Sequence, residues 1–208
     1  MHWRNPAPAR PGFFQPYLPT PSHVVPHGPM WVHEIKHDGY RLIVRRTNDR
    51  VRLLTRRGYD WTKRFPRVVD AVKRLRVTSV ILDGEAVVCG EDGVSDFNRL
   101  HSQSCDELVF LYAFDLLEIN GEDFRAEPLE KRKAKLEKLL SRQIDGIMFN
   151  EHLSDEGAII FKHACKLGLE GIVSKRIDMP YRSGRTKRWI KVKNPDGPAM
   201  LRIQDGTW

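Results

Sequence analysis

With 208 residues and a mass of 24.1 kDa, the chain can form one generous domain, or one domain with short extensions. Its 35 Lys and Arg against 27 Asp and Glu give a net charge of +8, which makes nucleic acid the first partner to consider. A basic but functionally silent surface fits the charge equally well. No apolar run approaches the ~20 residues that cross a membrane, and the N-terminus has no apolar signal core.

Three cysteines without paired spacing predict neither a disulfide framework nor a zinc site. They fit a reducing cytoplasm. Residues 1–30 are rich in proline, which excludes a helix or a central strand there. We expect this segment to run extended over the surface, pinned by a few apolar side chains. These are Phe13, Phe14, Tyr17 and Leu18.

A compact domain is predicted over residues 31–194, followed by a short tail over 195–208. Runs of β-branched and aromatic residues predict strands at 31–36, 40–46 and 51–55. The first two are expected to join as a hairpin across Asp38-Gly39. Asp60 is expected to cap a helix that reaches about Leu75, with a break near Pro66.

Beyond this helix the predicted strands alternate with helices. Strands are expected at 79–82 and 85–89, interrupted by Asp83-Gly84, then at 108–117, 144–149, 171–174 and 189–193. Helices are expected at 95–103, at 128–140 with a solvated charged face, and after an N-cap at Ser154. Residues 181–187 are expected to form a loop, and the period of the last strand places Lys191 and Lys193 on one face.

Several polar residues lie at the ends of these predicted strands. They are Lys36, Glu85, Asp115, Glu170, Lys191 and Lys193. Each alone is most simply a surface residue. As a set they supply what nucleotidyl transfer requires, which is a nucleophile for phosphorus, carboxylates for a divalent cation, and cations for a triphosphate.

Six short motifs resemble, in chain order, those of the covalent nucleotidyltransferase superfamily of ATP-dependent DNA ligases, RNA ligases and mRNA capping enzymes. They are K-x-D-G-x-R at 36–41, S-R-x-G at 55–58 with Thr for Ser, D-G-E at 83–85, an aromatic-acid strand at 112–117, E-G-[IL]-[MV]-x-K at 170–175 and W-[IL]-K-[IVL]-K at 189–193. One such motif is weak evidence, whereas six in the right order are strong. Residues 181–185 and 193–195 make the chain most similar to the bacterial end-joining ligase branch.

The resemblance implies an α+β fold with mixed, mainly antiparallel sheets flanked by helices, the ATP-grasp-like nucleotidyltransferase (adenylation) fold, with ATP between the sheets. Lys36 is expected to take AMP from ATP as lysyl-AMP and pass it to the 5′-phosphate of nicked DNA. Nearby cations, namely the metal ion and Lys191 or Lys193, are expected to lower the pKa of Lys36, because only a neutral amine attacks. Asp38 and Asp115 are expected to support the structure locally, and His37 is assigned no role.

The resemblance also implies which residues bind metal and nucleotide. Glu170, with help from Glu85, is expected to hold Mg²⁺ (or Mn²⁺), and Lys191 and Lys193 to contact the α-phosphate and stabilise the transition state. The expected nucleotide-binding residues are Glu34 and Ile35 through their backbone, with Arg41, Arg56, Glu85, Phe114 and Lys175. Phe114 is expected to stack on adenine.

Complete ligases of this superfamily carry an OB-fold domain after the last motif, and the 15 residues beyond Lys193 cannot form one. We therefore expect slow self-adenylation, doubtful nick sealing by this chain alone, and a separate OB-fold or end-joining repair protein as a possible partner. Two alternatives stay open. One is an RNA ligase or other polynucleotide 5′-adenylyltransferase, and the other is a non-catalytic repair module that retains the nucleotide pocket. A bacterial cytoplasmic protein, associated with the nucleoid when on DNA, is expected.

Overall fold

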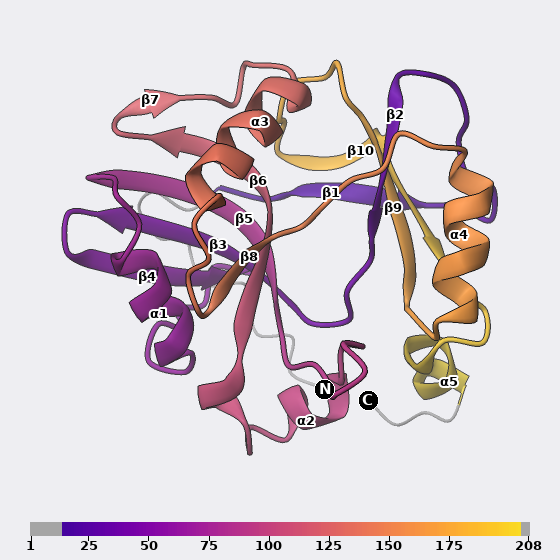
Figure 1. Cartoon of the computed structure of the whole chain (residues 1–208), viewed down its shortest axis with the longest axis horizontal. Coiled ribbons are helices and arrows are strands. Elements are labelled where there is room, and N and C mark those ends of the chain that lie inside the picture. The colour runs from indigo at the N-terminus through magenta and orange to yellow at the C-terminus, as the bar shows by residue number, and fades with distance from the viewer. Residues whose placement is uncertain (1–13, 205–208) are drawn as a thin grey trace, which may run out of the picture.

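The computed structural model describes residues 14–204, in which two β-sheets lie on either side of the molecular centre (Figure 1). The smaller sheet has four strands in the order β1 (Tyr17–Pro21), β10 (Gly184–Lys193), β9 (Gly171–Arg176) and β2 (Trp31–Ile35). Strands β10, β9 and β2 are antiparallel, and β1 runs parallel to β10. Strand β9, which follows directly on Glu170, therefore lies between β10, which carries the W-I-K-V-K motif, and β2, which ends directly before Lys36.

The larger sheet has six strands. Its main order is β4 (Arg50–Thr55), β3 (Tyr40–Thr47), β5 (Ser79–Val87), β6 (Phe110–Ile119) and β7 (Glu122–Asp123), and β8 (Ile147–Phe149) pairs in parallel with β6. The other pairs are antiparallel. The predicted α+β fold with mainly antiparallel sheets is confirmed.

Helices cover the outer faces of the two sheets. Helices α1 (Pro66–Lys73) and α3 (Leu129–Leu140) contact the larger sheet, and α4 (Gly157–Lys166) contacts β9 and β2. Shorter turns form α2 (Phe97–His101), the 3₁₀ turn η1 (Asp106–Leu108) and α5 (Pro198–Gln204). The main core lies between the larger sheet and its helices, and a smaller aromatic cluster fills the space between the sheets. None of the described helices is long and apolar enough to cross a bilayer.

The predicted hairpin across Asp38-Gly39 is wrong. Strand β2 pairs with β9, whereas β3 pairs with β4 and β5, so residues 36–39 cross from one sheet to the other. Gly39 is needed for close packing, because a Cβ there would lie 2.2 Å from the carbonyl oxygen of Ala86. The nucleophile motif therefore lies at the junction of the two sheets.

Other expected boundaries also differ. Strand β5 runs unbroken through Asp83-Gly84, since glycine lets the backbone of β6 approach: a Cβ on Gly84 would lie 2.7 Å from the Tyr112 carbonyl oxygen. Helix α1 begins at Pro66, the position that tolerates a missing N–H, rather than after Asp60. Helix α4 is preceded by Glu156 and not by Ser154, and β10 already begins at Gly184, inside the predicted loop.

The charged face expected on the helix at 128–140 is only partly solvated. Arg132 and Lys133 of α3 are 0% and 1% exposed, and Arg132 forms two hydrogen bonds with the buried carboxylate of Asp115. In the proline-rich segment, Tyr17 and Leu18 are buried in or beside β1, and Phe13 lies outside the described residues. The domain boundaries at residues 30 and 194 stay predictions.

Candidate active site

Lys36 lies directly after β2, where the chain leaves the smaller sheet. Its Nζ donates to Glu170 Oε2 at 2.5 Å, and its backbone N–H donates to the Gly171 carbonyl at 3.0 Å. Gly171 has φ of +132°, and a Cβ there would lie 2.1 Å from the Val192 carbonyl oxygen. Glycine thus allows β9 to begin close to β10, and this brings Glu170 to Lys36.

A second lysine shares the same carboxylate. Lys193 Nζ lies 3.2 Å from Glu170 Oε1, because β10 pairs with β9 in a register that sets Lys193 opposite Gly171. The side chain of Glu170 is only 5% exposed and that of Lys36 is 19% exposed. Lys191 is near enough that burial, Lys36 and Lys193 lower its pKa. The motifs at 36–41, 170–175 and 189–193 therefore converge on one charged cluster.

In the protein alone, the pKa of Lys36 is raised, although its neighbouring lysines favour a lower value. Burial alone would lower it, but the carboxylates of Glu170, Glu85 and Asp38 outweigh burial and raise the pKa above its ordinary value. Lys191 and Lys193 do not reverse this effect, since three carboxylates surround the ammonium and Glu170 bonds it directly. In the free protein Lys36 is therefore held protonated and bonded to Glu170.

Glu85 lies on β5, across the site from Glu170. Burial is the main cause that raises its pKa to about 7, and repulsion from Glu170 and Asp83 adds to this effect. Lys36 and Arg41 act in the opposite direction but do not outweigh it. Two carboxylates that repel each other across a half-buried site suit a small divalent cation, and Mg²⁺ is commonly bound by one or two carboxylates together with substrate phosphates and water. Among residues 14–204 no cluster of three or more His, Cys, Asp or Glu could hold a metal by itself.

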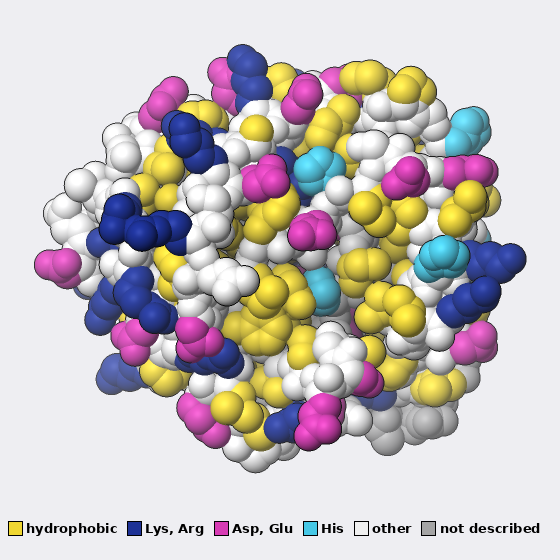
Figure 2. Space-filling view, viewed as in Figure 1, with side chains coloured by type: hydrophobic (Ala, Val, Ile, Leu, Met, Phe, Trp, Pro, Cys, Tyr) yellow, Lys and Arg dark blue, Asp and Glu magenta, His cyan; other side chains and the backbone are white. Residues whose placement is uncertain are grey.

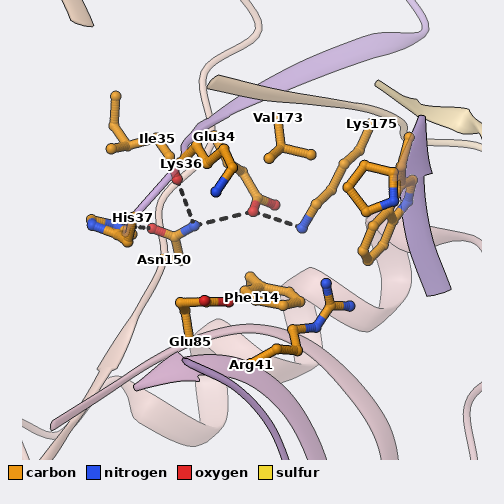
Figure 3. Close-up of a pocket in the computed structure, with 12 residues that line it drawn as sticks. Glu34, Ile35, Lys36, His37, Arg41, Glu85, Phe114, Asn150, Val173 and Lys175 are labelled. Carbon is orange, nitrogen blue, oxygen red and sulfur yellow. Dashed lines mark hydrogen bonds and ion pairs between the residues drawn. The ribbon is translucent and has the colours of Figure 1, made fainter. Parts of the chain in front are cut away.

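A pocket opens between the two sheets beside Lys36 (Figure 3). Including its open mouth it measures about 460 Å³, a size that accommodates a small ligand. Its lining includes most of the residues expected at the nucleotide. These are Glu34, Ile35, Lys36, Arg41, Glu85, Phe114 and Lys175. The pocket thus places an aromatic ring, cations and carboxylates around one cavity.

Phe114 lies between charged groups of both sheets. The Arg41 guanidinium is 4.6 Å and the Lys175 ammonium 4.2 Å from the centre of its ring, and Trp189 contacts it edge-on at 6.1 Å. Arg41 is fixed by Asp83, with Nε–Oδ1 and Nη2–Oδ2 distances of 2.5 and 2.7 Å. The Arg41 guanidinium is thus fixed beside the Phe114 ring before any ligand enters.

Arg56 is the exception among the expected nucleotide contacts. It lines an adjoining open cavity together with Arg57, Tyr59 and Trp61, which meets the first pocket at Arg41 and Glu85. The structure therefore does not bring Arg56 to the walls around Phe114.

The back of the pocket holds a buried charge cluster that no sequence motif predicts. Glu34 is 2% exposed, accepts from Lys133 Nζ at 2.7 Å and Lys175 Nζ at 2.6 Å, and also accepts from the Asn150 amide at 3.1 Å. Burial raises the pKa of Glu34, but the two lysines outweigh it and the net pKa is lowered. Burial is the main cause that lowers the pKa of Lys175 to about 8. The side chain of Glu34 is therefore fully engaged by groups of the protein.

His37, which the sequence left without a role, packs against the larger sheet. Its ring stacks on Tyr112 with centroids 3.8 Å apart, and its Nε2 lies 3.0 Å from Asn150 Oδ1. Asn150 also donates to the Ile35 carbonyl at 3.5 Å, so one side chain contacts the residues on both sides of Lys36 (Figure 3). The position before Asp38 carried no recognisable pattern, and the partner lies 113 residues away.

Comparison with known proteins agrees with this geometry. The family model described as "ATP dependent DNA ligase domain" matches residues 20–193. The multifunctional non-homologous end joining protein LigD of Pseudomonas aeruginosa is 41% identical over 187 residues, covering 88% of this chain and 22% of that protein. LigD of Mycobacterium tuberculosis is 36% identical over 165 residues, covering 79% and 22%.

A solved structure of mycobacterial DNA ligase D complexed with ATP and MES superposes with a TM-score of 0.73 at 32% identity, covering 86% of this chain and 60% of that one. The chain thus spans about a fifth of the length of the curated relatives named here. Because the match extends across both sheets and all six motifs, the chain belongs to the ATP-dependent DNA ligase domain family.

Proposed function

We propose that this chain is the adenylation domain of a DNA ligase of the bacterial end-joining type. In this proposal Lys36 accepts AMP from ATP, with release of pyrophosphate, and the AMP then passes to the 5′-phosphate of nicked DNA. The observation that carries the proposal is the position of Lys36 Nζ, 2.5 Å from Glu170 and at the wall of a pocket that also holds Phe114 and Glu85.

The proposed reaction forms an N–P bond between Lys36 Nζ and the α-phosphorus and breaks the bond from that phosphorus to pyrophosphate. The attacking amine must be neutral, so Lys36 has to lose a proton and its contact with Glu170 must open. Lys191 and Lys193 are placed to balance negative charge on the α-phosphate as it develops. Phe114 offers a ring for adenine, and the backbone of Glu34 and Ile35 offers polar groups to its edge.

Glu170 and Glu85 are proposed to hold Mg²⁺ or Mn²⁺. When bound, such an ion would draw Glu170 away from the ammonium and neutralise phosphate oxygens. The repulsion between the two carboxylates in the free protein supports this assignment.

Nicked DNA is the proposed acceptor of AMP. The net charge of +8 supports contact with the phosphate backbone, and Figure 2 shows Lys and Arg side chains gathered along the edge of the molecule that carries the larger sheet. The printed names of the relatives place them in end joining, so a repair protein of that process is the proposed partner. Action on chromosomal DNA would place the chain in the bacterial cytoplasm.

The test is incubation with ATP labelled at the α-phosphate and Mg²⁺, followed by a denaturing gel. Wild type should carry label that resists denaturation, Lys36→Ala should not, and the exposed control Lys187→Ala should label normally. Chelation with EDTA should abolish labelling. An unlabelled wild type, or a labelled Lys36→Ala, would refute the assignment. Adding nicked DNA, and separately nicked RNA, identifies the acceptor by which one removes the label, and consumption of RNA alone would make the chain an RNA ligase domain.

A further inference from the structure

The short helix α5 reaches back to the nucleophile motif from the far end of the described chain. Arg202 of α5 donates a short hydrogen bond from Nη2 to Asp38 Oδ2, and its guanidinium carbon lies 4.8 Å above the ring of Phe97. The two paired side chains are 11% and 16% exposed. The contact joins residues 164 apart in sequence.

The chain that leads to α5 is also fixed to the site. Asn194 follows β10, its backbone N–H donates to the Glu170 carbonyl at 2.9 Å, and its side chain donates to the Leu169 carbonyl at 3.0 Å. The Gly197 N–H then donates to the Asn194 carbonyl at 3.2 Å, directly before α5 begins. A continuous path of contacts therefore runs from the backbone of Glu170 through α5 to Asp38.

This path and the Lys36–Glu170 pair close a ring around the nucleophile. Glu170 holds the Lys36 ammonium, and Arg202 holds the carboxylate two residues further along the same crossing segment. The other side of Asp38 is fixed by its backbone N–H, which donates to Ser95 Oγ at 3.0 Å. Apart from the bond of the Lys36 N–H to the Gly171 carbonyl, residues 36–39 pair with no strand, so these contacts hold the segment in place of a β-ladder.

We propose that Arg202 is a positioning residue for Lys36, which acts by holding Asp38 and thereby fixing the backbone that carries the nucleophile. The inference rests on the proposed adenylation of Lys36 and adds a residue beyond the last sequence motif. Arg202 also gives Asp38 a cation of its own. The direct bond of the Lys36 ammonium is then to Glu170, whereas Asp38 bonds Arg202 and acts on Lys36 only from a distance.

The alternative is that Arg202 only attaches α5 to the surface. The two hypotheses predict different effects on the crossing segment when Arg202 is removed. If Arg202 merely anchors the helix, its loss should release residues 198–204 and leave residues 36–41 unchanged. If Arg202 positions the nucleophile, its loss should loosen residues 36–41 and slow the formation of lysyl-AMP.

The test compares Arg202→Ala, Arg202→Lys and the control Leu201→Ala, which lies on the same helix and is 47% exposed in wild type. Single-turnover labelling with ATP should show a rate reduced roughly 10- to 100-fold in Arg202→Ala, as expected for a misplaced nucleophile, with the KM for ATP near the wild-type value. Arg202→Lys should recover much of the rate, since a single hydrogen bond reaches Asp38. Leu201→Ala should match wild type.

Hydrogen–deuterium exchange provides a readout that does not need catalysis. Exchange across residues 36–41 should rise in Arg202→Ala and stay unchanged in Leu201→Ala. Wild-type labelling rate in Arg202→Ala, or faster exchange confined to residues 198–204, would overturn the inference. If wild type forms no adduct at all, the proposed function fails, and the exchange data still decide whether Arg202 orders the segment around Lys36.

Discussion

Replacing Lys133 by methionine should destabilise the protein strongly, although Lys133 lies on a helix whose charges look solvent-exposed in the sequence. Its Nζ donates to Glu34 Oε1 at 2.7 Å and to the Asn150 carbonyl at 3.0 Å, in a site where Glu34 and Lys133 are 2% and 1% exposed. The variant keeps the length of the side chain but leaves one carboxylate oxygen of Glu34 without its cation.

The magnitude follows from the asymmetry of buried ion pairs. Removing one partner of such a pair costs about 3 to 5 kcal/mol, because the remaining charge stays desolvated. Lys175 still bonds the other oxygen at 2.6 Å, so we expect the lower end, about 3 kcal/mol. For a chain of this size that corresponds to a fall in Tm of roughly 6 to 12 °C.

Urea unfolding at pH 7, followed by tryptophan fluorescence, measures the free energy of unfolding directly. Lys138→Met, an exposed lysine on the same helix, is the matched control and should change stability by less than about 0.5 kcal/mol. The double variant Glu34→Gln/Lys133→Met should be no more stable than Lys133→Met, because it also removes the carboxylate that pairs with the Lys175 ammonium, which is 2% exposed. A loss below about 1 kcal/mol in Lys133→Met would show that Glu34 is not a buried charge that needs both lysines.

Two further predictions concern the backbone on either side of the site. Burial lowers the pKa of His37 to about 4. Between about pH 4 and 6.5 the folded state therefore binds fewer protons than the unfolded state. The stability that comes from neutral His37 is present above about pH 6.5 and is lost as the pH falls through about 4. When the pH is lowered over that range, the free energy of unfolding of His37→Gln should fall by about 1 to 3 kcal/mol less than that of wild type, as measured by urea titrations. If the free energies of the two proteins fall in parallel with pH, the imidazole is not buried in its neutral form. Gly171→Ala would place a Cβ 2.1 Å from the Val192 carbonyl oxygen and should leave little folded protein by circular dichroism, whereas Gly168→Ala has φ of +70° with open space around it and should cost only about 1 to 2 kcal/mol. Equal stability of the two alanine variants would contradict the close approach of β9 and β10.

Local patterns in the sequence identified most strands and the residues that meet at Lys36, and they failed where a contact partner lies far along the chain. The motif order predicted that Lys36, Glu170 and Lys193 belong together, and the ion pairs of Glu170 at 2.5 and 3.2 Å place them so. The hairpin prediction failed because an Asp-Gly pair between two apolar runs has the same pattern whether the strands pair or cross between sheets. Gly39 is present for packing against Ala86, which no local pattern reveals.

The charges of α3 show the same limit. A run of Lys and Arg on an amphipathic helix normally faces solvent, and only the burial of Glu34 and Asp115 on distant strands turns Lys133 and Arg132 inward. The pKa of Lys36 in the protein alone depends on the fold in a similar way. Its cationic neighbours were visible as motif lysines, but their effect depends on which carboxylates lie nearer, and that is a property of the folded site.

The two sheets supply different groups to the site, which explains why Lys36, the proposed nucleophile, lies between them. The smaller sheet supplies Glu170, Lys191 and Lys193, while the larger sheet supplies Glu85 and Phe114. Lys36 belongs to neither, and its segment is held from the first by the Gly171 carbonyl and from the second by His37 stacked on Tyr112. In the proposed reaction, Lys36 can release Glu170 when a nucleotide enters without breaking a strand ladder. The position of Lys36 then depends on those side-chain contacts. Single substitutions at Asn150 or Arg202, outside the six motifs, should therefore alter the rate at which Lys36 is adenylated.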